Sequence, residues 1–337
     1  MRSTGAESAP FGLFQPFTLL YLLSCNRILT RQQKLKLPKP WSKIYRHIIY
    51  CVPTFSNPSG KSMSLSHRIA LVKLARRYDA LIITDDVYDS LQWLVAPSSS
   101  TDLAVPSSLK KALLPRLVDI DRTLKPIPTS DSFGNAVSNG SFSKIAGPGV
   151  RTGWAEGTQK FTYGLSQCGS SRSGGAPSQL TATIINELLT SSALHAHIET
   201  VLKPTYQKRC NLMMEAIKRE LLPLGVAIGE DTLKGTDGVF GGYFIWIELP
   251  KGVDAELVVS RAKSEEELIV APGKIFEVQG DESIKFPNGV RLCFSWEAEE
   301  DLNEGVVRLA RVVQRILGGK SGEDGERIDK QDLGEFQ

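Results

Sequence analysis

The chain has 337 residues, of which 41% are hydrophobic, and its 40 basic and 37 acidic side chains give a net charge of +3. This length predicts about two domains, and the hydrophobic content is enough for a sizeable core. The near balance of charge gives no indication of binding to nucleic acid or to a membrane surface. Five scattered cysteines without a CxxC pair are typical of reduced thiols in a reducing compartment such as the cytoplasm.

The first 40 residues differ from the rest of the chain. Their longest uninterrupted apolar run is Phe17 to Leu23, far shorter than the roughly 20 residues that a membrane span needs. A signal peptide is the alternative, and Glu7 and Pro10 count against it. We therefore expect residues 1–40 to be a poorly ordered segment that does not belong to the folded body beginning near Trp41.

Half of a βαβ unit is predicted near residue 80. Apolar residues at helical spacing predict a helix over residues 66–78, and the run 81–84 predicts a buried parallel strand directly after it. The strand ends in Asp85. Ligands of open α/β sheets bind at the carboxyl ends of the strands, so Asp85 is a candidate binding residue. Asp86 is more simply an N-cap or a solvated carboxylate, and no role is assigned to it.

The next segments are predicted to be mainly loops. Residues 96–108 and 125–140 contain serine and proline and are predicted as loops, with a short strand over residues 117–120 between them.

A single lysine follows the second loop in an unusual setting. The sequence Ser141-Phe142-Ser143-Lys144 precedes a Gly-Pro-Gly turn and Arg151. An amine, two hydroxyl groups and a guanidinium would there converge on one ligand that carries an aldehyde and a phosphate. Pyridoxal phosphate (PLP) is such a ligand, because its aldehyde condenses with a lysine amine. An ordinary turn near glycines is the alternative interpretation.

The second half of the chain alternates helices and strands. A helix is predicted over residues 178–189, and a longer helix over residues 195–221 should be kinked or interrupted at Pro204. Further predicted elements are a strand over 290–294, an amphipathic helix over 298–317 and a charged, disordered tail over 318–337. His195 and His197 point to different faces of their helix, so no metal site is predicted.

Five stretches of sequence, in their order along the chain, resemble one protein family. They are Phe55-Ser56-Asn57-Pro58-Ser59-Gly60, Asp85-Asp86-Val87-Tyr88, the Lys144 motif, residues 241–250 and residues 290–296. Together they resemble the fold-type I PLP-dependent aminotransferases of class I and II. The first three are most similar to the branch that contains aromatic and 2-aminoadipate aminotransferases. The resemblance runs from about Trp41 to about Leu317.

The resemblance implies an α/β fold, the PLP-transferase fold type I. It would have an incomplete, mostly parallel large-domain sheet flanked by helices, and a smaller C-terminal α+β domain. The implied division is a partial PLP-binding large domain over residues 41–221 and a small domain over residues 222–317. Residues 1–40 would then be a segment foreign to the family, joined to a shortened enzyme.

The resemblance also implies a role for each candidate residue. Lys144 would bind the cofactor covalently and later shuttle a proton. Asp85 would pair with the pyridine nitrogen of the cofactor. The other implied roles are as follows: Tyr88 and Asn57 hold the phenolate oxygen, Ser141, Ser143 and Arg151 bind the phosphate, and Arg291 takes the substrate α-carboxylate in a bidentate pair.

The activity implied is the transfer of an amino group between an amino acid and a 2-oxo acid, by a cytoplasmic homodimer. Decarboxylation, β-elimination and acyl-CoA condensation occur on the same fold, and Arg291 favours substrates that keep their α-carboxylate. A nicotinamide dehydrogenase is a poor alternative, because Gly147 and Gly149 do not continue into a G-x-G-x-x-G motif.

One departure from the family favours another alternative. Members of the family carry a phosphate-binding loop and an aromatic residue that stacks on the cofactor, both ahead of the Asn-Pro-Ser-Gly motif. Only 56 residues precede Asn57 here, and neither feature is recognisable among them. The chain would then be a catalytically impaired pseudoenzyme or a dimerisation module.

Overall fold

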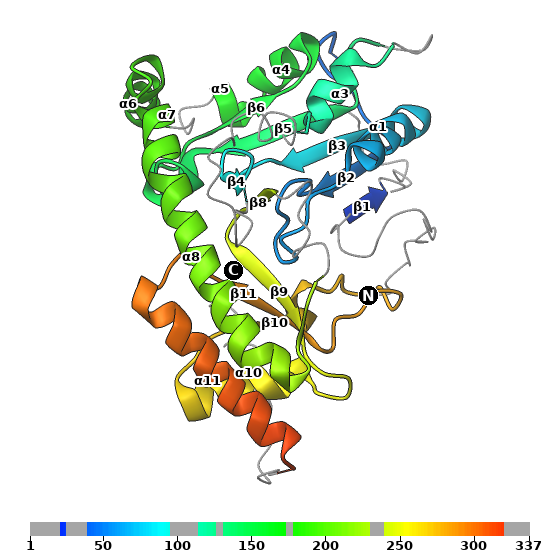
Figure 1. Cartoon of the computed structure of the whole chain (residues 1–337). Helices are drawn as coiled ribbons and strands as arrows, with labels where there is room; N and C mark the ends of the chain where they lie inside the picture. The colour runs from blue at the N-terminus through cyan, green and yellow to red at the C-terminus, as the bar shows by residue number, and fades with distance from the viewer. Residues whose placement is uncertain are drawn as a thin grey trace. The chain divides into compact units, whose positions relative to one another are not determined.

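The computed structural model describes residues 39–94, 114–125, 131–172, 178–229 and 239–319, together with the backbone of residues 21–24. The loop predicted over 96–108, most of the segment 1–40 and the tail from residue 320 lie outside the described residues. The chain divides into two compact units (Figure 1). The first consists of Met1–Ser56, Ser62–Leu91 and Thr101–Ile198, and the second of Asn57–Lys61, Gln92–Ser100 and Glu199–Gln337.

A five-stranded sheet forms the centre of the first unit. Its strands are, in spatial order, β1 (Tyr21–Ser24), β2 (His47–Cys51), β3 (Ala80–Asp85), β5 (Ala136–Ser141) and β6 (Gly153–Glu156). The two central pairs, β2 with β3 and β3 with β5, are parallel. The two outer pairs are antiparallel. The sheet expected to be mostly parallel is therefore parallel only in its centre.

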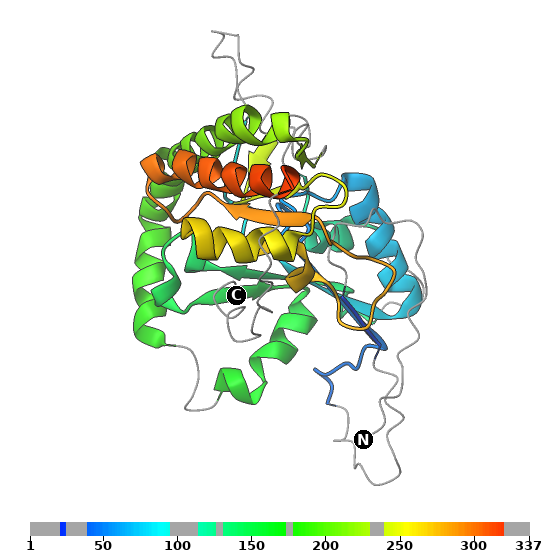
Figure 2. The ribbon, with the colours of Figure 1, turned by 90° about the horizontal axis from the view of Figure 1, so that it is seen from below.

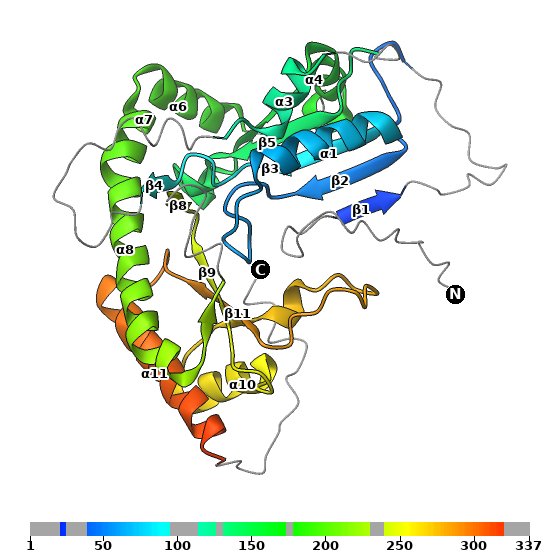
Figure 3. The same cartoon turned by 45° about the vertical axis from the view of Figure 1, so that its right-hand side comes forward.

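Helices cover both faces of this sheet. The helices α1 (Leu65–Tyr78) and α3 (Leu117–Thr123) pack on the face that carries Ala80 and Ile82. Figure 3 shows α1 running along β2 and β3. Phe161, from helix α4 (Gln159–Ser166), packs with Leu81 on the opposite face. Alternate residues of a strand point to opposite faces, so β3 is apolar on both sides.

Two predictions for this unit were wrong. Residues 117–120 are the start of α3 rather than a strand, because the Asp119 side chain caps the helix start by accepting a hydrogen bond from the Arg116 amide at 3.1 Å. A short apolar run does not by itself distinguish a helix from a strand. The loop predicted over 125–140 ends early, since β5 begins at Ala136. The small and polar residues of β5 do not form a strand pattern in the sequence, and the strand is stabilised by pairing with β3 and β6 on its two sides.

The first unit also contains three short helical segments beyond β6. They are α5 (Gly169–Arg172), α6 (Gln179–Thr190) and α7 (Ala193–His197). Helix α6 confirms the helix predicted over residues 178–189, and the Ser178 side chain caps it by accepting a hydrogen bond from the Thr181 amide.

The predicted long helix over residues 195–221 is interrupted. A π-helical turn, Ile198–Leu202, joins α7 to α8 (Lys203–Ala216), and a second π turn, Ile217–Leu221, follows. The first π turn lies directly before Pro204, whose missing N–H cannot complete the α-helical ladder. The kink or interruption predicted at Pro204 is therefore confirmed as an interruption, which lies just ahead of this residue.

The second unit is an α+β layer. Its main sheet is wholly antiparallel and contains β10 (Ala271–Pro272), β11 (Gly289–Cys293), β9 (Phe244–Glu248) and β7 (Ala227–Ile228). A small second sheet pairs β4 (Gln92–Leu94) with β8 (Val239–Gly241). Helix α11 (Glu299–Leu317) runs alongside α8 (Figure 2) and also packs against α10 (Ala255–Glu266).

One apolar core holds the second unit together. It includes Cys210 and Met213 of α8, Ile245 of β9 and Leu309 of α11. Helix α8 therefore packs with the second unit, although the sequence assigned it to the large domain. The domain boundary after Leu221 stays a prediction. None of the helices in the described part of the chain has the length and apolar content of a membrane span.

A buried polar cluster lies on the α1 face of the first sheet. The Arg68 side chain, 1% exposed, donates hydrogen bonds to the carbonyl oxygens of Pro53 and Met63, at 3.0 and 2.9 Å. Its charge also interacts with the carboxylates of Asp89 and Asp86. The side chains of Thr84 and Ser138 donate hydrogen bonds to Asp86. Asp86 is therefore a buried carboxylate, and the expectation of a solvated side chain or an N-cap was wrong.

Replacing Arg68 tests this cluster. Arg68→Met keeps the bulk of the side chain but removes the positive charge that interacts with the carboxylates of Asp86 and Asp89. Burial raises the pKa of Asp86, and burial together with the charge of Asp86 raises the pKa of Asp89. The charged forms of both carboxylates are therefore unfavourable here without a nearby cation. We expect a loss of about 3–5 kcal/mol in the free energy of unfolding, measured by urea denaturation.

The matched control is Arg77→Met on the same helix. Arg77 is exposed and stacks on the Tyr78 ring at 5.5 Å. Its replacement should change the free energy of unfolding by less than about 0.5 kcal/mol. Equal stability of the two variants would contradict the role assigned to Arg68.

Candidate active site

Two of the candidate residues lie at the same edge of the first sheet. Asp85 is the last residue of β3, and it pairs in parallel register with Asn139 of β5. Lys144 ends the 3₁₀ turn Phe142–Lys144, which begins directly after β5. Because parallel strands end at a common edge, the carboxylate and the amine are both at the carboxyl end of the sheet.

The Asp85 carboxylate is held from both neighbouring strands. The Tyr50 hydroxyl, on β2, donates to Asp85 Oδ2 at 2.8 Å. The Asn139 side-chain amide, on β5, donates to Asp85 Oδ1 at 3.3 Å. Each carboxylate oxygen therefore accepts a hydrogen bond from a different strand. Neither partner was predicted from the sequence, since both become neighbours of Asp85 only through strand register.

The hairpin after β5 brings the phosphate candidates together. The Ser141 hydroxyl accepts a hydrogen bond from the Ser143 amide at 3.1 Å and donates to the Ser143 hydroxyl at 2.9 Å. Antiparallel pairing of Ser141 with Gly153 continues through a hydrogen bond from the Phe142 amide to the Thr152 carbonyl.

Arg151 occupies a tight position in this hairpin. Its φ of 46° is left-handed, and its guanidinium donates to the Pro148 carbonyl at 3.2 Å. The hairpin also requires a glycine at position 140. A Cβ there would lie 2.1 Å from the Trp154 ring, so the indole lies across β5 where a side chain would otherwise stand.

Tyr88 also belongs to the first unit. It lies in the turn that follows β3, and only 4% of its surface is exposed. The structure thus brings six of the eight candidates into one unit. They are Asp85, Tyr88, Ser141, Ser143, Lys144 and Arg151.

The other two candidates, Asn57 and Arg291, belong to the second unit and contact each other. A nitrogen of the Arg291 guanidinium (Nη1) donates to Asn57 Oδ1 at 2.8 Å. The same guanidinium lies 4.3 Å from the ring centre of Phe244 and 4.9 Å from that of Phe276. Two aromatic faces and one amide therefore fix the plane of the guanidinium. The sequence did not predict the two rings or the Asn57 contact.

Gly60 lets the Asn57 loop approach β9. Its φ is +67°, and a Cβ at this position would lie 2.9 Å from the Phe244 carbonyl oxygen. Only glycine combines that backbone angle with such a close approach. The Pro-Ser-Gly sequence after Asn57 thus has a structural purpose in the second unit.

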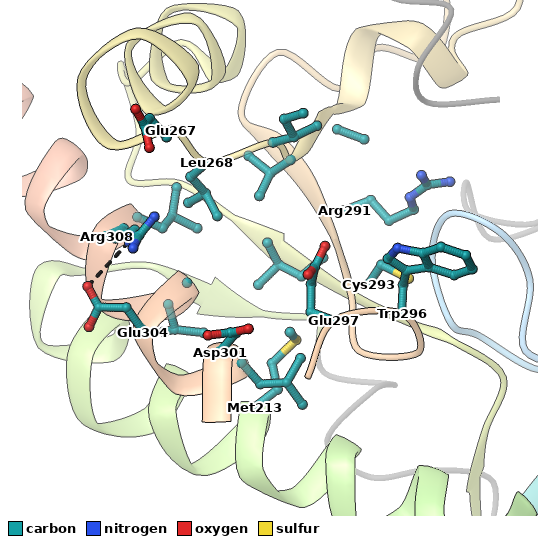
Figure 4. A pocket seen from close by; sticks show the side chains of 18 residues that line it. Met213, Glu267, Leu268, Arg291, Cys293, Trp296, Glu297, Asp301, Glu304 and Arg308 are labelled. Atoms are coloured by element: carbon teal, nitrogen blue, oxygen red, sulfur yellow. Dashed lines mark hydrogen bonds and ion pairs between the residues drawn. The ribbon is translucent and has the colours of Figure 1, made fainter. Parts of the chain in front are cut away.

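A cavity of about 530 Å³ lies in the second unit next to Arg291. Figure 4 shows Arg291, Cys293 and Trp296 at one end, and the ion pair between Arg308 and Glu304 at the other. The carboxylates of Glu297 and Asp301 also line it. The described residues contain no cluster of three histidine, cysteine or acidic side chains suited to a metal ion.

A larger cavity, of about 690 Å³, lies in the first unit at the amino ends of the parallel strands. His47, Asp79 and Asn135, which start or precede β2, β3 and β5, line it. It is therefore at the edge opposite Asp85. Its lining contains none of the candidate residues.

Comparison with known proteins identifies the family. The model of the family described as aminotransferase class I and II matches residues 32–309. The chain is 40% identical over 273 residues to the uncharacterized protein YER152C of Saccharomyces cerevisiae, covering 80% of this chain and 56% of that protein. It is 28% identical over 292 residues to the aromatic-amino-acid aminotransferase 1 of Thermococcus litoralis, covering 87% and 60%.

A solved structure agrees with these relatives. The α-aminoadipate aminotransferase from Thermus thermophilus, complexed with N-(5′-phosphopyridoxyl)-L-leucine, superposes with a TM-score of 0.58 at 26% identity. The superposition covers 80% of this chain and 59% of that structure.

The chain therefore belongs to the class I and II aminotransferase family. The expected resemblance to aromatic and 2-aminoadipate aminotransferases is confirmed, and so is the α/β fold. The chain spans between 56% and 60% of the length of these three relatives.

Proposed function

We propose that the protein is a PLP-dependent aminotransferase, which moves an amino group from an amino acid to a 2-oxo acid. One observation carries the proposal: Asp85 ends β3, and Lys144 lies just beyond the end of the neighbouring parallel strand β5, at the same edge of the sheet. Membership of the aminotransferase family supports it. So does the phosphopyridoxyl compound in the related Thermus structure.

The groups at this edge fit PLP by their chemistry. The cofactor has a basic ring nitrogen, an aldehyde and a phosphate dianion. The first unit offers a carboxylate at Asp85, an amine at Lys144, and the hydroxyl groups of Ser141 and Ser143 with the guanidinium of Arg151. The carboxylate suits the basic ring nitrogen, the amine suits the aldehyde, and the hydroxyl groups and guanidinium suit the phosphate. Tyr88 would add a hydrogen-bond donor for the phenolate oxygen.

When bound, PLP supplies an aldehyde that condenses with amines and a ring that accepts electrons. The chain's own residues do the rest. Asp85 would pair with the ring nitrogen and favour its protonated form, and Ser141, Ser143 and Arg151 would hold the phosphate. The Lys144 amine would take a proton from the Cα of the amino acid and deliver it to the C4′ carbon of the cofactor.

Arg291 would bind the α-carboxylate of the substrate. Phe244 and Phe276 already hold its guanidinium in one plane, and Asn57 accepts a hydrogen bond from one of its nitrogens. A fixed, planar fork suits a carboxylate, which it can bind through two parallel hydrogen bonds. Asn57 would also serve the phenolate oxygen of the cofactor, as the family resemblance implies.

Two further properties belong to the same proposal. We propose a homodimer, as the family resemblance implies, that works in the cytoplasm. Four cysteines of the described residues are free thiols, and Cys168 is exposed. Exposed free thiols are typical of a reducing compartment.

Removal of the Lys144 amine tests the proposed function. Wild-type protein incubated with PLP and then reduced with borohydride should retain a phosphopyridoxyl group. Lys144→Ala should fold as the wild type does but retain none, because it has no amine to condense with the aldehyde. Mass spectrometry of the intact protein measures the added mass.

Lys160→Ala is the control, since this exposed lysine of the same unit donates to the Asp131 carbonyl and lies over the Phe133 ring. It should be labelled like the wild type. Labelling of Lys144→Ala at the wild-type level would refute the proposal.

Arg291→Lys tests substrate binding. Lysine keeps the charge but loses the planar fork, so the KM for the amino acid should rise by about tenfold or more. The absorption spectrum of the bound cofactor should stay unchanged. Arg311→Lys, on an exposed face of α11, should leave KM unchanged. An unaltered KM in Arg291→Lys would remove Arg291 from the substrate site.

A further inference from the structure

The carboxylate of Asp85 has a supporting shell of its own. Tyr50 is the fourth of the five residues of β2 and pairs with Ile83, two residues before Asp85 on the same face of β3. Asn139 is the direct cross-strand partner of Asp85. Side chains on that face therefore reach the carboxylate from both sides, and the two hydrogen bonds measure 2.8 and 3.3 Å.

Two donors on two oxygens have a specific physical effect. Together they restrict rotation of the carboxylate, because each oxygen is tied to a different strand. A hydrogen bond donated to a carboxylate also stabilises its charged form. A group that must pair with a cationic ring nitrogen benefits from the restricted rotation, since its orientation is then set before the ligand arrives.

We propose that Tyr50 and Asn139 are positioning residues that hold the Asp85 carboxylate in one orientation for the ring nitrogen of PLP. The inference rests on the proposed function and extends it to two residues that touch neither cofactor nor substrate. Tyr50 has the larger effect, because it is half-buried and its bond is the shorter, whereas Asn139 is exposed.

Tyr50→Phe removes only the hydroxyl group. We expect PLP to bind about tenfold more weakly, as is typical for the loss of one hydrogen bond to a charged group. The pKa of the ring nitrogen in the bound cofactor should fall by about one unit. The ¹⁵N chemical shift of ring-labelled PLP on the protein, followed from pH 6 to 9, reports this protonation directly and needs no turnover.

Tyr45→Phe is a matched control. Tyr45 is buried in the same unit, and its hydroxyl donates to the Gly134 carbonyl at 2.7 Å. It lies two residues before β2, at the end of that strand remote from Asp85. Loss of this hydroxyl removes a comparable hydrogen bond, so it should lower stability without changing the ¹⁵N shift.

The double variant Tyr50→Phe/Asn139→Ala tests whether the two donors act on one group. Either hydrogen bond alone restrains the carboxylate in part. The fold-loss in PLP affinity of the double variant should therefore exceed the product of the fold-losses of Tyr50→Phe and Asn139→Ala measured singly. Independent, multiplicative losses would contradict a joint action on Asp85.

The outcomes separate this inference from the proposed function. Wild-type protein that binds no PLP would refute both. Wild-type protein that binds PLP, with a Tyr50→Phe variant of equal affinity and equal ¹⁵N titration, would refute the positioning role alone. An equal change in Tyr45→Phe and Tyr50→Phe would also refute it, because the effect would then be one of general stability.

Discussion

The parallel pairing of β3 with β5 is the constraint on which the candidate site depends. It aligns Asp85 with Asn139, so a carboxylate at the end of one strand and a lysine just beyond the end of the next reach the same edge. A slip of one residue in this register would turn Asp85 to the other face of the sheet. The apolar residues on both faces of β3 hold the register, because such a slip would exchange the neighbours of every one of them.

The side chains at the carboxyl end of β3 have different surroundings on the two faces of the sheet. Asp85 faces Tyr50 and Asn139, whereas Asp86, the next residue, is buried on the side of α1 with Thr84, Ser138 and the charge of Arg68. The two adjacent carboxylates thus lie in different environments: Asp85 is placed to bind a ligand, and Asp86 is buried in the core. A buried charge network is costly unless it is complete, which makes the strand end sensitive to loss of any member.

The sequence was most informative where chemistry is local. The run Ala80–Asp85, the Ser-Phe-Ser-Lys motif and the amphipathic helix α11 all carry their structure in their own residues. Strand β5 was missed because alanine, serine, asparagine and glycine have little strand propensity, and pairing on both sides fixes them instead. The supporting residues Tyr50 and Asn139, and the aromatic rings around Arg291, depend on contacts between distant segments, which no local pattern reports.

The most direct test of this account is a crystal structure of the chain grown with PLP. The account expects the ring nitrogen within about 3 Å of an Asp85 oxygen, the Lys144 nitrogen joined to the former aldehyde carbon, and Tyr50 still bonded to the carboxylate. A cofactor bound elsewhere, or an Asp85 carboxylate and a Lys144 amine too far apart to reach one pyridine ring, would contradict it.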